Sequence, residues 1–170
     1  MIHVETSVEP PWPEGDWPAL ADRAVRAALA AGPHGDMLDA RFTAEVSVRL
    51  TSDEAVQALN RDYRQKDRPT NVLSFPMVQP DLLGALANSD DGEVLLGDVI
   101  LAHGVAAREA EEKGVALDAH AAHLIVHGTL HLLGHDHEQG EAEAEAMEAI
   151  ERAALASLGI ADPYAREDEG

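Results

Sequence analysis

The sequence predicts a single α/β domain over residues 1–170, with a small mixed four-stranded sheet packed with about five helices. The length of 170 residues is typical of one domain. Residues 43–50 alternate apolar and polar side chains with the period of a strand, whereas residues 16–31 carry apolar side chains at helical spacing. Both kinds of segment recur along the chain without an internal repeat or a low-complexity linker, which indicates one domain.

The N-terminal segment is expected to form a strand followed by a helix. Residues 2–8 alternate loosely and suit a first strand, which a cluster of prolines ends. Residues 16–31 form the helix, with Asp16 as its cap, and Gly32-Pro33 closes it.

The clearest strand, residues 43–50, is followed by a second predicted helix and a third strand. Thr51 with Glu54 three residues later matches a capping box at the start of the helix. The apolar stripe of this helix is expected at Ala55, Leu59 and Tyr63. Residues 70–75 suit a strand that Pro76 stops.

The second half of the chain is expected to contain the central strand and the buried helix. Residues 77–92 show no firm period and are interpreted as a long exposed excursion. Residues 93–102 are almost continuously apolar, as in a central strand. A charged helix over 103–115 ends near Gly114, and Asp118 is expected to cap the next helix, which is apolar enough to be buried.

The C-terminal segment is rich in alanine and glutamate and predicts an amphipathic acidic helix over residues 138–158. Its apolar side is expected at Ala142, Ala146, Ile150 and Leu155. Residues 162–170 are expected to be a frayed acidic tail.

The formal net charge is −20 with only 12 lysines and arginines, which argues against a general nucleic-acid-binding surface. Four of these cations fall within eight residues: Arg61, Arg64, Lys66 and Arg68. On composition alone this segment is typical of a solvated loop, since Asp62 and Asp67 partly cancel its charge. If the substrate is anionic, we expect it to bind at this local patch.

The absence of cysteine excludes disulfides and thiolate metal sites, so a transition-metal site must use histidine and carboxylate. No basic start with an apolar core and no apolar run near the ~20 residues of a membrane span occurs. We therefore expect a soluble cytoplasmic protein without a membrane partner.

A histidine motif, H-x-x-x-H-x-x-G-x-x-H, occupies residues 127–137. His127 and His131 are one helical turn apart, and Gly134 can end the helix in the left-handed conformation so that His137 returns to them. Three nitrogen ligands with one open position are typical of a catalytic zinc. We predict one Zn²⁺ per chain.

Gly128 separates this motif from the metzincin proteases, which share the spacing but carry a glutamate base after the first histidine. Peptide hydrolysis is therefore the weaker interpretation. Phosphodiester cleavage suits the site if a cation stabilises the negative charge that builds on the phosphorane oxygens. Arg64 is the candidate because guanidinium binds phosphate in a bidentate manner.

The stretch 127–137 resembles the signature of the YbeY family of bacterial ribosomal-RNA maturation endoribonucleases, H-G-x-L-H-L-x-G-Y-D-H. Residues 59–76 resemble the family's second block, and G-D-V-I at 97–100 resembles its strand before the site helices. The C-terminal E-A-E-A-M-E-A-I-E through L-G-I-A-D-P-Y resembles its closing helix. The resemblance covers about residues 40–165, and it departs at His135, where the family usually has tyrosine.

The resemblance implies zinc bound by His127, His131 and His137, and an essential arginine at Arg64. It also implies cleavage of single-stranded RNA, a part in 16S rRNA 3′ end maturation and ribosome quality control, and association with the small ribosomal subunit and its proteins. A metal-dependent peptidase or small-molecule hydrolase, and a noncatalytic ribosome-assembly factor with a structural zinc, stay open as alternatives.

The helix that carries the histidines is expected to pack on the sheet, with the basic loop as the opposite wall of a cleft. Four further residues are expected around this cleft. Asp136 is either a turn residue or a carboxylate that holds the second nitrogen of a ligand imidazole. His123 is expected to be packed or to support a ligand, rather than to be a fourth ligand. Ser74 and Asn71 are placed in the cleft by their adjacency in sequence to the basic segment.

Overall fold

A mixed four-stranded sheet is the centre of the computed structural model, which describes all residues except 34, 40–42, 79–92, 136–139 and 161–170. The strands are β1 (Ile2–Val8), β2 (Thr43–Thr51), β3 (Val72–Pro76) and β4 (Glu93–Ala102), in the order β1-β2-β4-β3. The first three strands in that order run parallel, whereas β3 pairs antiparallel with β4. The predicted α/β domain with a four-stranded mixed sheet is confirmed.

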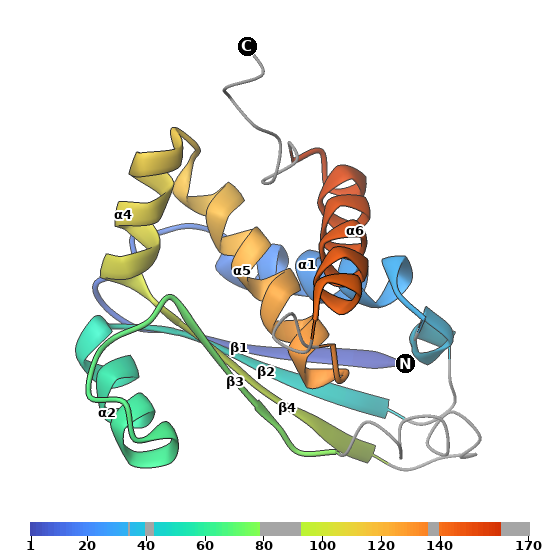
Figure 1. Cartoon of the computed structure of the whole chain (residues 1–170), viewed down its shortest axis with the longest axis horizontal. Coiled ribbons are helices and arrows are strands. Elements are labelled where there is room, and N and C mark those ends of the chain that lie inside the picture. Colours follow the sequence, from blue (N-terminus) through green and yellow to red (C-terminus); the bar gives the residue numbers. More distant parts are fainter. Residues whose placement is uncertain (34, 40–42, 79–92, 136–139, 161–170) are drawn as a thin grey trace.

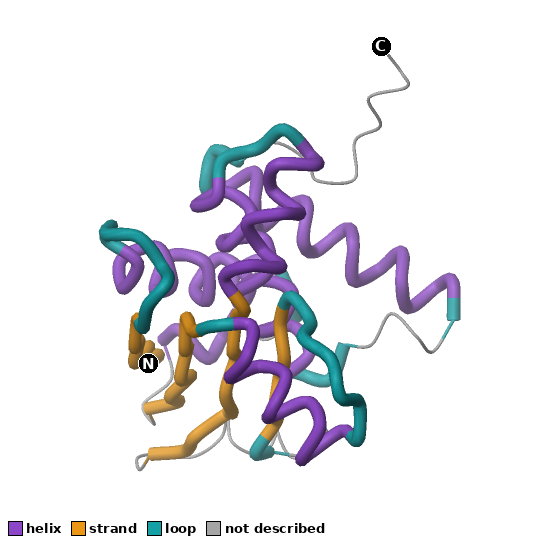
Figure 2. Tube along the Cα trace, turned by 90° about the vertical axis from the view of Figure 1, so that its left-hand side faces the viewer, coloured by secondary structure: helices purple, strands orange, loops and turns teal. Residues whose placement is uncertain are grey.

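Five α-helices are described, together with a short 3₁₀ turn, η1 (Gly35–Asp39). The helices are α1 (Trp17–Ala31), α2 (Asp53–Arg64), α4 (His103–Lys113), α5 (Leu117–Leu132) and α6 (Glu141–Ser157). Figure 1 shows α5 crossing the sheet with α1 and α6 on the same side, and α2 on the other side. Figure 2 shows the strands side by side with most of the helices above them.

The sheet separates two apolar clusters. Val99 and Leu101 of β4 belong to the larger cluster, which includes residues of α1, α5 and α6. Ile100 and Ala102 point the other way and join Val56 of α2 in a smaller cluster. Since successive side chains of a strand face opposite sides, apolar layers on both faces account for the nearly continuous apolar run of β4.

Helix α5 is the buried helix, as predicted. Ile125 and Leu130 have no exposed surface, and the helix packs against α1, β3 and β4. Its end is the predicted glycine turn, because Gly134 has a φ of 96° and the backbone N–H of His135 donates to the Leu130 carbonyl at 3.0 Å. A left-handed residue there is what allows the chain to turn back after the helix.

Two predicted helix caps are wrong. Thr51 is the last residue of β2, where its hydroxyl donates to a Glu9 carboxylate oxygen, and Ser52 caps α2 instead by accepting from the Ala55 N–H at 3.2 Å. Asp118 lies in the first turn of α5, and no side chain caps that helix. The sheet pairing of Thr51 outweighs its local capping preference.

The predicted buried faces of two helices are also corrected. In α2, Tyr63 is 70% exposed, whereas Val56 and Asn60 are buried. In α6, Ala142 and Ala146 are exposed, and the buried face is formed by Met147, Glu151, Ala154 and Leu155. Alanines on both sides of α6 left its orientation poorly specified by hydrophobicity.

Several predicted segments fall outside the described residues. They are most of the excursion over 77–92, the start of the C-terminal helix before Gly140, and the tail over 162–170. Among the described helices, none is long and apolar enough to cross a membrane.

Candidate active site

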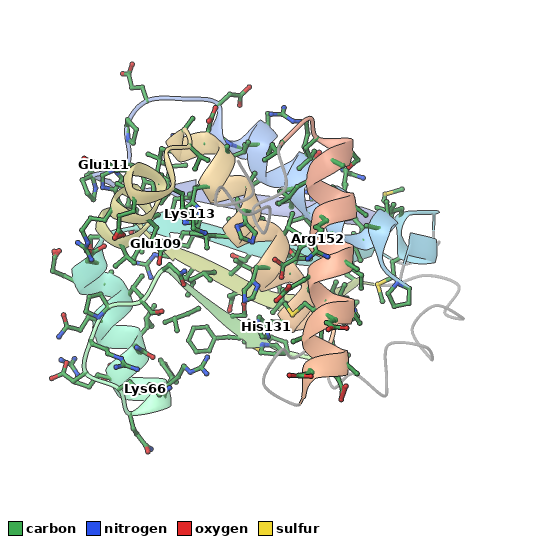
Figure 3. All side chains as sticks on the ribbon, turned by 45° about the horizontal axis from the view of Figure 1, so that its top comes forward. Lys66, Glu109, Glu111, Lys113, His131 and Arg152 are labelled. Atoms are coloured by element: carbon green, nitrogen blue, oxygen red, sulfur yellow. The ribbon has the colours of Figure 1, made fainter. Side chains whose placement is uncertain are left out.

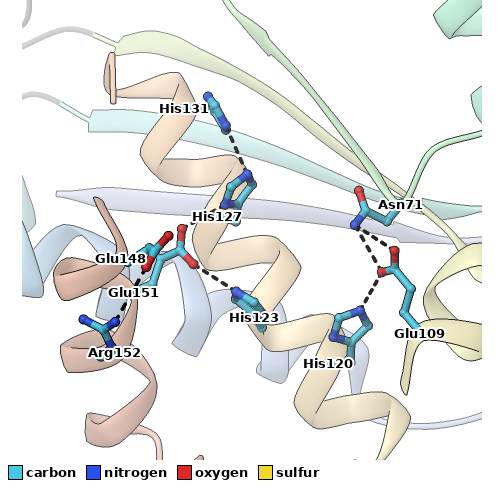
Figure 4. A network of polar contacts seen from close by, with 9 residues as sticks. All are labelled: Asn71, Glu109, His120, His123, His127, His131, Glu148, Glu151 and Arg152. Atoms are coloured by element: carbon cyan, nitrogen blue, oxygen red, sulfur yellow. Dashed lines mark hydrogen bonds and ion pairs between the residues drawn. The ribbon is translucent and has the colours of Figure 1, made fainter. Parts of the chain in front are cut away.

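Two of the three predicted zinc ligands meet on α5. His127 and His131 lie one turn apart, and their Nε2 atoms are separated by 3.1 Å (Figure 4). His137, predicted as the third ligand, and Asp136, predicted as either a turn residue or a support for a ligand imidazole, lie outside the described residues.

The histidine pair has the geometry and chemistry of a partial zinc site. Tetrahedral zinc with Zn–N bonds of about 2.0–2.1 Å separates two ligand nitrogens by about 3.3 Å, close to the distance between these Nε2 atoms. Within the described residues, no three histidine or carboxylate side chains come together as a possible metal site. The described part of the chain therefore supplies two nitrogen donors that fit zinc.

A buried carboxylate from α6 supports this pair. Glu151 is 1% exposed, and its two oxygens accept from His127 Nδ1 at 2.8 Å and from His123 Nε2 at 2.9 Å. His123 is thus packed and bonded behind the histidine pair, on the side away from His131 (Figure 4). In the sequence, Glu151 is distinguished from the other glutamates of α6 only by its helical spacing from Met147 and Leu155, which are buried in the structure.

A cleft of about 660 Å³ opens in front of the histidines. Its lining includes His127, His131 and His135, from α5 and the turn after it. Arg64, Lys66 and Arg68, from the end of α2 and the loop that follows, also line the cleft and are called the cationic wall. Figure 3 shows Lys66 beside α2 and His131 on α5, two separate parts of the fold. No acidic side chain is among the described residues that line the cleft. In a chain with a net charge of −20, this is a local cationic surface in the same cleft as three histidines.

Backbone geometry and one buried amide hold the cationic wall in place. Gln65 ends α2 in the left-handed conformation, with φ 60°, and the N–H of Lys66 donates to the Asn60 carbonyl at 3.1 Å. The Asn60 side chain, in a residue 2% exposed, donates from Nδ2 to the Arg68 carbonyl at 2.9 Å. Asn60 therefore fixes both ends of the loop that carries the cations, a role that the sequence analysis did not identify.

The fourth cation of the predicted patch lies elsewhere. Arg61 is not among the residues that line the cleft. Its guanidinium lies 3.2 Å from a carboxylate oxygen of Asp62 and 4.0 Å from one of Asp67. The cleft wall therefore has three cations rather than four.

Gly128 allows α5 to lie directly on the sheet. A Cβ added there would approach Val99 Cγ1 to 2.7 Å and Ser74 Oγ to 3.0 Å. The Ser74 hydroxyl also donates to the Gly128 carbonyl at 3.1 Å, which joins β3 to the helix. Position 128 thus faces the sheet, and a glutamate base of the metzincin kind has no room there.

Asn71 and Ser74 both line the cleft, and both make hydrogen bonds within the protein. The Asn71 amide donates to the two oxygens of Glu109 at 3.1 and 3.3 Å. Glu109 also accepts from Nε2 of the buried His120 at 2.8 Å, and burial lowers the pKa of His120. These three side chains line a second hollow of about 350 Å³, which shares Asn71 and His127 with the cleft.

Comparisons with known proteins agree with the resemblance seen in the sequence. The profile of the family described as Endoribonuclease YbeY matches residues 16–159. A protein named Endoribonuclease YbeY from Rhizorhabdus wittichii is 66% identical over 97% of this chain and 98% of its own length. Its namesake from Sphingopyxis alaskensis is 60% identical over 99% of this chain and 100% of its own length.

A solved structure supports the fold independently. The solution structure of a Thermotoga maritima protein superimposes with a TM-score of 0.55 over 98% of this chain and 100% of that chain. Its sequence identity of 22% makes this a likeness of fold alone. With the profile match over most of the chain and relatives of high identity along nearly its full length, the chain belongs to the endoribonuclease YbeY family.

Proposed function

We propose that this chain is a zinc-dependent endoribonuclease that cleaves single-stranded RNA in the cytoplasm. Its substrate is ribosomal RNA, and its role lies in 16S rRNA 3′ end maturation and ribosome quality control, on the small ribosomal subunit and its proteins. Family membership supports the endoribonuclease activity. The observation that carries the proposal is the cleft, which brings three histidines together with three cations and has no acidic side chain among its described lining residues.

In this proposal His127 and His131 hold the zinc together with His137, and the described pair fits nitrogen ligation of that metal. When bound, zinc supplies Lewis-acid chemistry that polarises a phosphoryl oxygen or a water molecule. Glu151 keeps His127 oriented from behind. Position 128 is a glycine that faces Val99, so the helix has no glutamate there to accept a proton.

Arg64 is the proposed catalytic residue of the opposite wall. It is the last residue of α2, it is exposed, and it lines the cleft. A guanidinium can bind two phosphate oxygens at once and stabilise the charge that develops on them during cleavage. Lys66 and Arg68 lie along the same wall and would bind the neighbouring phosphates.

The charge distribution supports a single strand as substrate. The body of the protein repels RNA, since the net charge is −20, and the attraction is confined to one cleft. A flexible strand can bend so that a few phosphates enter the cleft, whereas a rigid duplex would bring many more phosphates against the acidic body.

Arg64→Ala tests this proposal, with Arg61→Ala as the matched control on the same helix. We expect Arg64→Ala to lower the rate of single-stranded RNA cleavage at least 100-fold while the zinc content stays at one per chain. Arg61→Ala removes the same charge from outside the cleft and should change the rate less than threefold. Equal effects of the two variants would contradict the role of the cleft.

The two alternatives predict other results in the same assay. A peptidase or small-molecule hydrolase would cleave casein or an ester in a chelator-sensitive manner and would be indifferent to Arg64→Ala. A noncatalytic assembly factor with a structural zinc would bind small subunits and leave purified RNA uncut. Either result would overturn the proposed activity.

A further inference from the structure

We propose that Glu151 is a positioning residue for the metal site: it holds His127 in the tautomer and orientation that turn Nε2 toward the metal. The inference rests on the proposed zinc site and adds to it a residue from α6, outside the histidine motif. Asp136, the sequence-based candidate for a carboxylate in this role, lies outside the described residues and stays a prediction, whereas the contacts of Glu151 are described.

Glu151 is almost completely buried, which is unusual for a glutamate. It is 1% exposed and lies on the same helix face as Met147, Ala154 and Leu155, which are buried apolar residues. A glutamate is rarely fully buried unless its charge is compensated, because removal from water is costly. Each of its oxygens receives a hydrogen bond from an imidazole, one from His127 and one from His123.

The direction of these bonds fixes the state of His127. An ionised carboxylate only accepts, so His127 donates from Nδ1. A neutral imidazole with Nδ1 protonated carries its lone pair on Nε2, and this is the atom that faces His131 Nε2 at 3.1 Å. The same hydrogen bond fixes the orientation of the ring, because it joins Nδ1 of His127 to a buried carboxylate oxygen of Glu151 on α6.

A purely structural role for Glu151 would be to join α5 and α6. The pair formed by Glu109 and His120 provides a comparison, because it also joins a glutamate to a buried histidine of α5, at 2.8 Å. His120 is almost two turns from His127 and lies outside the predicted ligand set. Removal of the Glu109 carboxylate should therefore affect packing and not metal affinity.

The test is the zinc affinity of the wild type, Glu151→Gln and Glu109→Gln, measured by competition with a chromophoric chelator at one pH. We expect Glu151→Gln to bind zinc 10- to 100-fold more weakly, and Glu109→Gln to remain within threefold of the wild type. Thermal unfolding of the metal-free proteins reports separately on the packing that each variant loses. If Glu151→Gln unfolds at a lower temperature but binds zinc as the wild type does, Glu151 is only structural and the inference is wrong.

A second measurement does not depend on how the variants fold. Nitrogen chemical shifts of the His127 imidazole in the metal-free wild type should show a protonated Nδ1 and an unprotonated Nε2. The opposite tautomer, or an unresolved mixture, would overturn the inference. A wild type with the expected tautomer that bound no zinc would instead overturn the proposed function, so the two failures are distinguishable.

Discussion

Replacement of Gly128 by alanine tests the close approach of the site helix to the sheet. The added Cβ would lie 2.7 Å from Val99 Cγ1, whereas carbon atoms pack best at about 3.5–4.0 Å. Either Val99 or α5 must therefore move by about 1 Å. Overpacking of this kind typically costs about 1–3 kcal/mol, and the better helix propensity of alanine returns about 1 kcal/mol. We expect a net loss of about 0–2 kcal/mol in the free energy of unfolding.

Because these two terms partly cancel, a double-mutant cycle with Val99→Ala is the sharper assay. Val99→Ala removes both Cγ atoms, the nearest of which blocks a side chain at position 128. In that background Gly128→Ala should be neutral or stabilising, apart from the remaining approach to Ser74 Oγ at 3.0 Å. The cycle, measured by urea unfolding of the metal-free protein, should give a coupling energy of about 1–2 kcal/mol. Additive effects within about 0.3 kcal/mol would refute the steric reason for glycine at this position.

Three other predictions follow from the site. Asn60→Ala should reduce the free energy of unfolding by about 1–2 kcal/mol, because it removes the hydrogen bond to the Arg68 carbonyl. It should also weaken RNA binding while the zinc content is unchanged. An unchanged RNA affinity would contradict the role of Asn60 in holding the loop that carries the cations. The association constant for a single-stranded RNA should fall with salt with a log–log slope of about −2 for three cations, and of about −1.4 after Arg64→Ala. Equal slopes would show that Arg64 does not contact a phosphate. Burial lowers the pKa of His120, so the folded protein binds a proton at this side chain less readily than the unfolded chain does. The stability of the fold is therefore unaffected by His120 protonation above its ordinary pKa of about 6.5, and falls as the pH drops below that value. His120→Gln should therefore reduce the fall in stability of the metal-free protein between pH 7.5 and 5.5, and an unchanged fall would contradict this assignment.

The strands and the turn after the site helix could be predicted from sequence because local patterns determine them. Residues 93–102 are apolar in succession and form β4 with the predicted bounds. Gly134 follows the last apolar turn of α5 and adopts the expected left-handed conformation. A cleft between the basic segment and the histidines was also expected. That prediction depended on the family resemblance, because composition alone favoured a solvated loop for the basic segment.

The residues that support the site could not be predicted in the same way. Glu151 lies 24 residues from His127 in a helix whose glutamates look alike in sequence, and only the packing of α6 on α5 selects it. Asn60 is a polar residue on the buried face of α2, and its partner is a carbonyl of the loop rather than a side chain. Thr51 looked like a helix cap because its pairing with β4 is a long-range contact. Contacts between distant segments decide all three positions.

The central claim is that the histidines of α5 and the cationic wall form one zinc-dependent RNA-cleaving site. The most direct measurement is the cleavage rate of a labelled single-stranded RNA by zinc-loaded wild type and by His131→Ala, with the zinc content of each measured on the same sample. We predict that His131→Ala loses its zinc and that its rate falls at least 100-fold, although it still binds the RNA through the opposite wall. A zinc-free His131→Ala variant that cleaved the RNA at the wild-type rate would contradict the account.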